Sequence, residues 1–97
     1  MNIPQAIKIL RKFHDMTQQD LANKVGITKS HVSETESGKK NPSMATIQGY
    51  AHEFGVQPSE IVLLAEAIEN PNNIDSVISV FPHPKIQAML ELKNNFQ

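Results

Sequence analysis

Cysteine and tryptophan are absent from this chain of 97 residues, and aromatic residues make up only 5% of it. Without cysteine, the chain has neither a disulfide framework nor a thiolate metal site, and this composition suits a reducing compartment. No apolar run approaches the roughly 18 to 20 residues that a membrane helix requires, and no basic segment followed by an apolar one precedes the first helix. We therefore expect a cytoplasmic protein that does not enter a membrane.

The chain is also short and poor in glycine, which limits the chemistry that it can support. Its length allows one compact domain with an appendage, but no separate catalytic domain. Its four glycines stand singly, so they form no phosphate-binding loop, and we find no nucleophile-base arrangement or paired acidic motif. No two histidines have the i, i+4 spacing of a helical metal site. We expect no enzyme, no cofactor and no bound metal.

Charge is nearly balanced over the whole chain but unevenly distributed along it. The formal net charge is -1, yet residues 1–45 contain seven basic and four acidic residues and carry +3. From residue 46 onward two basic and six acidic residues give -4. A DNA duplex responds to the local field, which decays over roughly 8 to 10 Å in ordinary salt. The distribution therefore permits DNA binding without requiring it.

Apolar residues recur at helical spacing in five segments that capping signals separate. The spacing predicts helices over residues 3–13, 18–25, 29–36, 44–54 and 58–69. The predicted amino-terminal caps are Asn2, Thr17, Thr28 and Ser43, and the glycines expected at helix ends are Gly26, Gly38 and Gly55. Methionine and phenylalanine at these spacings, including Met44 and Phe54, are interpreted as core residues.

The clearest boundary in the sequence is the Asn-Pro-Asn-Asn segment at residues 70–73. It divides the chain into a domain over residues 1–69 and an extension over residues 70–97. Residues 74–81 fit either a helix or a short β-branched strand, and a helix is the favoured interpretation. A final helix is predicted after residue 84, so the extension is expected to be helical.

The second and third predicted helices meet at a tight turn. A helix-turn-helix requires a small residue where its helices touch, a glycine-type turn and a second helix that is polar on one side. Ala22, Gly26 and Val32 meet these needs at matching offsets, and the rest of the third segment is mostly polar. The sequence therefore predicts a helix-turn-helix over residues 17–36.

The order of residues around this motif resembles a known family. The matching stretches are residues 10–11, 16–22, 25–28, 32–33, 36–39, 41–43 and 54–56. Together they resemble the phage-repressor family of helix-turn-helix proteins, also called XRE or lambda-repressor-like. The resemblance implies an all-α domain of five helices and a DNA-binding transcriptional regulator, more specifically a repressor. It also implies that two copies bind a palindromic operator in double-stranded DNA.

The resemblance implies two sets of DNA contacts. Residues aligned with base-reading positions are Thr28, Lys29, Ser30, Ser33 and Glu34. Among the phosphate-binding candidates, Gln18 aligns with a family residue that holds a phosphate, and His31 on the third helix could touch one. The motif context adds Ser37, Lys39, Lys40 and Asn41, which lie just beyond that helix. Glu34 can accept a hydrogen bond from cytosine N4, but its alternative is a solvated or ion-paired carboxylate. The alternative for Gln18 is a simple exposed residue in the first turn of its helix, and the alternative for His31 is a residue at the rim of the interface.

Arg11 and Glu36 match a structural ion pair of the family, which would tie the first helix to the end of the third. Thr35 departs from the family, which usually has a bulkier apolar residue there, and this departure raises a question about local packing.

Dimerisation is the part of the hypothesis for which the sequence offers the fewest signals. The candidate interface residues are the apolar side chains Ile61, Leu64, Ile86, Met89 and Leu90. The alternative is that the extension packs back on its own domain. A second functional hypothesis is an antitoxin-type adaptor, which binds a partner protein through residues 70–97 and regulates its own promoter.

Overall fold

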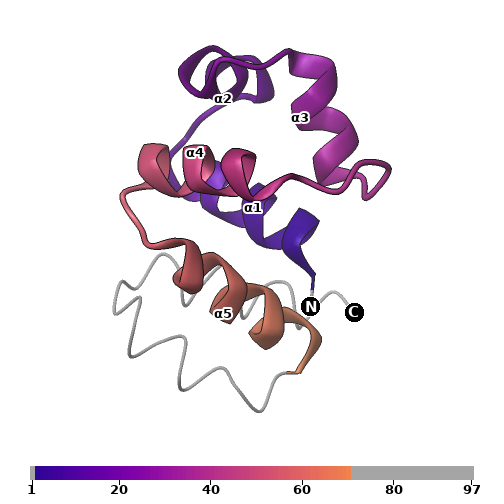
Figure 1. Ribbon diagram of the computed structural model, residues 1–97, viewed down its shortest axis with the longest axis vertical. Helices are drawn as coiled ribbons and strands as arrows, with labels where there is room; N and C mark the ends of the chain where they lie inside the picture. Colours follow the sequence, from indigo (N-terminus) through magenta and orange to yellow (C-terminus); the bar gives the residue numbers. More distant parts are fainter. Residues whose placement is uncertain (1, 71–97) are drawn as a thin grey trace.

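The computed structural model describes residues 2–70, and this part of the chain contains five α-helices and no strand. The helices are α1 (Ile3–Phe13), α2 (Gln18–Val25), α3 (Lys29–Glu36), α4 (Met44–Phe54) and α5 (Pro58–Glu69). The predicted all-α fold of five helices is therefore confirmed. In Figure 1, α2 and α3 lie together at one end, α5 lies at the other, and α1 and α4 lie between them. The predictions made for residues 71–97 fall outside the described residues.

Short side chains begin most of these helices by accepting hydrogen bonds from backbone N–H groups that lack a partner in the first turn. The Asn2 side chain accepts from the Gln5 N–H at 3.1 Å, and the Ser43 hydroxyl accepts from the Thr46 N–H at 3.1 Å. At the other end of a helix, Gly26 has φ +82°, a left-handed conformation that most side chains disfavour. Asn2 and Ser43 therefore cap their helices, and Gly26 ends its helix, as predicted.

The hydrophobic core joins all five helices. α1 packs most extensively against α5, α2 packs against α3, and α4 contacts α1, α2 and α5. The largest fully buried apolar side chains are Ile7, Leu10, Leu21, Val32, Tyr50, Ile61 and Leu64. Burying one such side chain contributes about 1.5 to 3 kcal/mol relative to leaving it in water. The core therefore fixes α3 on the scaffold through Val32.

Two interpretations of apolar residues need correction. Met44, expected in the core, is 64% exposed, because it stands in the first turn of α4, whereas the buried residues of that helix begin at Tyr50. Ile61 and Leu64, expected at a dimer interface, are fully buried in the core of their own chain. A side chain with no exposed surface has none left to offer a second subunit. Ile86, Met89 and Leu90 lie outside the described residues.

Thr35, where the family usually has a bulkier apolar residue, is fully buried in the core. The smaller side chain therefore does not prevent α3 from packing there. The hydroxyl of Thr35 and that of Tyr50 are both buried, and neither has a hydrogen-bond partner of acceptable geometry. Burial raises the pKa of Tyr50 above its ordinary value of 10.0. The nearby Thr35 hydroxyl opposes this shift in pKa, and the negative charge of Glu36 adds to it. The core therefore contains two polar oxygen atoms, one on Thr35 of α3 and one on Tyr50 of α4.

Candidate nucleic-acid interface

Local hydrogen bonds fix the start of α2 and both ends of the turn between α2 and α3. Thr17 begins α2 with a reciprocal pair of hydrogen bonds: its hydroxyl accepts from the Asp20 N–H, and its N–H donates to the Asp20 carboxylate, each at 3.0 Å. The N–H groups of Gly26 and Ile27 both donate to the Ala22 carbonyl, at 2.9 and 3.0 Å. Thr28 begins α3 by accepting from the His31 N–H at 3.0 Å. The predicted helix-turn-helix is therefore present.

The capping carboxylate of α2 is held in its charged form. The pKa of Asp20 is lowered from 3.8, first by the hydrogen bond from the Thr17 backbone and then by the Thr17 hydroxyl. Lys24, one turn further along α2, lowers this pKa a little more. The cap is thus fully formed at neutral pH, where the carboxylate is ionised.

The outer face of α3 is polar and open to solvent. Val32 and Thr35 face inward with no exposed surface. Four exposed residues of the same helix line one shallow hollow of about 310 Å³: Lys29, Ser30, Ser33 and Glu34. These are four of the five predicted base-reading residues, and the structure brings them together on one surface. The fifth, Thr28, is exposed beside them and retains its O–H as a donor, since its oxygen acts as an acceptor in the cap.

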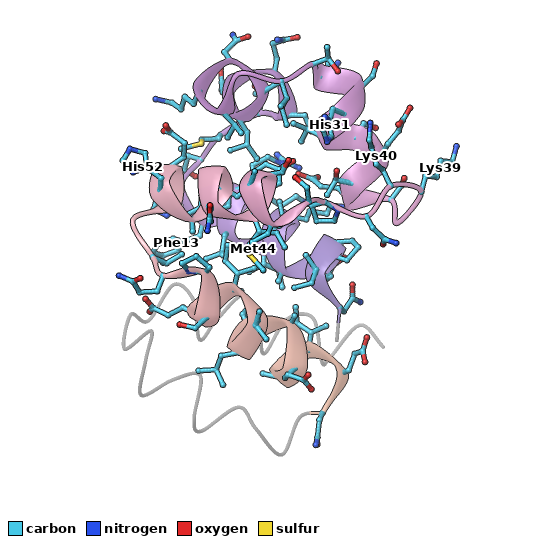
Figure 2. All side chains as sticks on the ribbon, in the orientation of Figure 1. Phe13, His31, Lys39, Lys40, Met44 and His52 are labelled. Atoms are coloured by element: carbon cyan, nitrogen blue, oxygen red, sulfur yellow. The ribbon has the colours of Figure 1, made fainter. Side chains whose placement is uncertain are left out.

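The loop after α3 holds three of the predicted phosphate-binding residues in a defined conformation. The Glu34 carbonyl accepts hydrogen bonds from the Lys39 N–H at 2.9 Å, the Lys40 N–H at 3.2 Å and the Ser37 hydroxyl at 3.0 Å. Figure 2 labels Lys39 and Lys40 in this loop and His31 on α3. Both lysines and Asn41 are exposed, and His31 is half-buried. Ser37 already donates its hydroxyl proton within the chain.

The predicted ion pair joins α1 to the end of α3. Arg11 Nε donates to Glu36 Oε2 at 2.7 Å, and Arg11 Nη2 donates to Oε1 at 3.0 Å. Arg11 Nη1 also donates to the Met16 carbonyl at 2.8 Å, in the connection between α1 and α2. The side chains of Arg11 and Glu36 are only 10% and 3% exposed. This bidentate pair fixes three consecutive elements relative to one another.

One contact of this pair was not expected from the sequence. Gln18 Nε2 donates to Glu36 Oε1 at 3.2 Å, so a predicted phosphate-binding residue is attached to the ion pair. Gln18 and Glu36 are separated by 18 positions, and no spacing rule connects residues so far apart on different helices. Only the packing of α2 against α3 brings them together.

Charge is segregated between the two ends of the described domain. Lys29, Lys39 and Lys40 stand on or just after α3, whereas residues 41–70 contain no lysine or arginine and include Glu53, Glu60, Glu66 and Glu69. The lysines on and just after α3, offset in part by Glu34, therefore favour binding of an anion near this face more than the acidic later part of the domain does. Across residues 2–70 the side chains assemble no cluster suited to holding a metal ion. None of the five helices in this range is long and apolar enough to cross a membrane.

Comparison with known proteins identifies the family. The sequence model of the helix-turn-helix family matches residues 7–61, which is more than half of the chain. The chain belongs to this family, in its phage-repressor or XRE branch, and it is a DNA-binding transcriptional regulator. No solved structure shows a significant match to it.

Three curated relatives illustrate the similarity. The competence pilus inhibition repressor of Acinetobacter baylyi is 38% identical over 74 residues, which cover 76% of this chain and 67% of the relative. The immunity repressor protein of Bacillus phage phi105 is 37% identical over 62 residues, 64% of this chain and 43% of the relative. Antitoxin PezA of Streptococcus pneumoniae is 38% identical over 60 residues, 62% of this chain and 38% of the relative. The similarity thus spans less than half the length of the last two.

Proposed function

We propose that this regulator binds a palindromic operator as a homodimer and inserts α3 into the major groove. The observation that carries the proposal is the two-sided character of α3, whose inward residues are fully buried while its outer residues line one exposed hollow. A rigid helix with one free polar side is the element that B-DNA accommodates in its major groove. Two copies would place these helices about 34 Å apart, one helical turn of DNA.

Side chains on the outer face of α3 offer the hydrogen-bond donors and acceptors that the edges of bases require. Lys29 can donate to O6 and N7 of guanine, Glu34 can accept from N4 of cytosine, and Ser30 can do either. Thr28 and Ser33 flank them on the same exposed surface. We propose that these five residues read the operator sequence.

Residues around this surface are proposed to hold the DNA backbone. Lys39, Lys40 and Asn41 are exposed in the loop after α3, and Gln18 and His31 stand on the two helices of the motif. Ser37 completes the set, and it would bind a phosphate by redirecting a hydroxyl that now donates to the Glu34 carbonyl. Such contacts position the protein without reading sequence. The two relatives named as repressors favour repression as the outcome.

The test begins with selection of duplexes bound by the protein from a random pool. An enriched sequence with two inverted half-sites is the expected result. Lys29→Ala should then weaken binding to that operator by about 1 to 3 kcal/mol and relax the preference at one position in each half-site. An equal loss on all sequences would show that Lys29 contacts only phosphate.

The phosphate contacts are tested by the salt dependence of affinity. Lys39→Ala should lower affinity evenly across sequences and reduce the slope of log affinity against log salt by about 0.9 for each phosphate that the variant no longer neutralises. Lys8→Ala, which removes a charge from α1 outside the proposed interface, serves as the matched control and should change the slope less. Equal slopes for Lys39→Ala and the wild type would contradict the assignment.

The proposed dimer surface rests on the extension, because Ile61 and Leu64 are buried. We propose Ile86, Met89 and Leu90 as its apolar contacts. Leu90→Glu would place a charge in that surface, and sedimentation of the full chain should then report monomers at a concentration where the wild type is dimeric. A dimer of unchanged stability would refute the role of this residue.

An antitoxin-type adaptor is the second candidate function, and the similarity to antitoxin PezA favours it. In this proposal residues 70–97 bind a partner protein while residues 1–69 bind the promoter. A stoichiometric partner that co-purifies with the chain from its own host would support it. A homodimer isolated alone under the same conditions would count against it. The cytoplasmic location expected from composition stays a prediction.

A further inference from the structure

We infer that Glu36 is a positioning residue for DNA binding, because it orients the side-chain amide of Gln18 toward the phosphate that Gln18 is proposed to hold. This inference rests on the proposed function and adds to it a role for the buried ion pair. The observation behind it is that one carboxylate accepts hydrogen bonds from both Arg11 and Gln18.

The carboxylate of Glu36 permits only one orientation of the Gln18 amide. An ionised carboxylate is purely an acceptor, so it attracts the NH2 group of a glutamine and repels its carbonyl oxygen. With Nε2 at 3.2 Å from Glu36 Oε1, the carbonyl oxygen of Gln18 is turned away from the ion pair. The second N–H of the same NH2 group takes part in no other hydrogen bond that the described residues show, and it is the donor that a phosphate oxygen needs.

Arg11 makes this arrangement compatible with a nearby phosphate. A free carboxylate beside a phosphate would repel it, but the guanidinium of Arg11 binds both carboxylate oxygens of Glu36, at 2.7 and 3.0 Å. The pair as a whole is close to neutral, and only 3% of the Glu36 side chain is exposed. The ion pair therefore orients the amide without presenting a net negative charge to DNA.

A double-mutant cycle on the selected operator tests the inference in the full chain. Gln18→Ala removes one net hydrogen bond from each half-site, so it should lower affinity about fivefold per half-site and about 25-fold for the dimer. Glu36→Gln keeps the size of the side chain but allows the Gln18 amide to rotate, so it should lower affinity about as much in the wild-type background. In the Gln18→Ala background Glu36→Gln should have little further effect. A purely structural role of Glu36 would instead give the same loss in both backgrounds, which would overturn the inference.

Gln19 provides the matched control for this cycle. It stands next to Gln18 on α2, but its amide donates to Asn23 Oδ1 at 2.9 Å and not to Glu36. Gln19→Ala and Glu36→Gln should therefore have independent effects on affinity. Coupling as large as that of the Gln18 pair would overturn the inference, because it would show that Glu36→Gln acts through the whole of α2.

Nuclear magnetic resonance of the wild type provides a second measurement that does not depend on the folding of a Glu36 variant. The two hydrogens of the Gln18 NH2 group give separate signals. Adding operator should shift the signal of the outward hydrogen and leave that of the hydrogen bonded to Glu36 nearly unchanged. Loss of the Glu36 hydrogen bond in the complex would overturn the inference while leaving the proposed function standing. Absence of any selected operator would instead refute the proposed function itself.

Discussion

The two halves of the described domain are held together in different ways. Residues 17–43, which include α2, the turn, α3 and the following loop, contribute only three of the fifteen buried hydrophobic residues. The half formed by α1, α4 and α5 contributes the other twelve. Both halves have capped helices and a left-handed glycine, so the feature that offsets the smaller core of the helix-turn-helix half is the Arg11–Glu36 pair, which ties α3 to α1. The apolar core thus lies mainly in one half, and the proposed recognition surface lies in the other.

This division predicts which substitutions the protein can accept without losing stability. Because the outer face of α3 is exposed and makes no contribution to the core, its residues can change with little cost in stability. Residues that set the angle between α2 and α3 are a separate group, since we expect them to influence the proposed recognition without touching DNA. Each of the following substitutions tests whether the two halves are as separable as this comparison suggests.

Leu64→Ala should have the largest effect on stability and should leave recognition unchanged. Leu64 is fully buried on α5, and removing a buried leucine side chain destabilises a domain by about 3 kcal/mol. Urea denaturation measures this loss, and Val62→Ala, at a position on the same helix that is 37% exposed, serves as the control. If the folded Leu64→Ala protein bound its operator more weakly by more than about twofold, the two halves would not be separable.

Gly26 and Gly55 each end a helix in the left-handed conformation, one in each half of the domain. The substitutions Gly26→Ala and Gly55→Ala therefore test the same change in both halves. Both glycines have a positive φ, +82° and +68°, and an added Cβ would meet nothing within 4 Å at either position. Each substitution should therefore cost about 1 to 2 kcal/mol through backbone strain alone. Only Gly26→Ala should also weaken operator binding in the folded protein, because Gly26 sets the angle between α2 and α3. Equal operator affinities for the two variants would contradict this expectation.

Thr35→Val should stabilise the domain by about 1 kcal/mol, because it removes a buried hydroxyl whose approach to the Tyr50 hydroxyl lacks the geometry of a full hydrogen bond. Valine retains the shape of threonine, so the contact between α3 and Tyr50 should persist. Thr46→Val is the control, since the Thr46 hydroxyl lies 3.0 Å from that of Ser43, and its loss should give no gain. A loss of stability in Thr35→Val, measured by thermal unfolding, would mean that the hydroxyl has a role in the core.

Asp20→Asn should have the smallest effect, and the effect should depend on pH. Hydrogen bonds from Thr17 lower the pKa of Asp20 in the folded state below 3.8. A carboxyl with a lowered pKa contributes stability above its unfolded-state pKa and loses it as the pH falls through the folded-state pKa. The difference in stability between wild type and variant should therefore be present at neutral pH and shrink below about pH 4. An equal difference at pH 7 and pH 3, measured by urea denaturation, would show that the charge of Asp20 does not matter.

Much of this architecture could be predicted from local sequence signals. Asn2, Thr17, Thr28 and Ser43 cap the helices that they were predicted to cap, and Gly26 and Gly55 end helices as expected. These signals are reliable because each depends on a hydrogen bond or a backbone angle within a few residues. The Arg11–Glu36 pair, by contrast, was predicted only from the family resemblance, since 25 positions separate the two residues.

The amino-acid sequence by itself determined where each helix begins and ends and which residues share a face, because these properties follow from short-range geometry. Only the tertiary structure decided which apolar residues the neighbouring helices cover, and so placed Met44 at the surface and Ile61 and Leu64 in the core. It also decided that Gln18 meets Glu36. Burial and long-range hydrogen bonds depend on how helices pack against one another, and the spacing of residues along one helix does not contain that information.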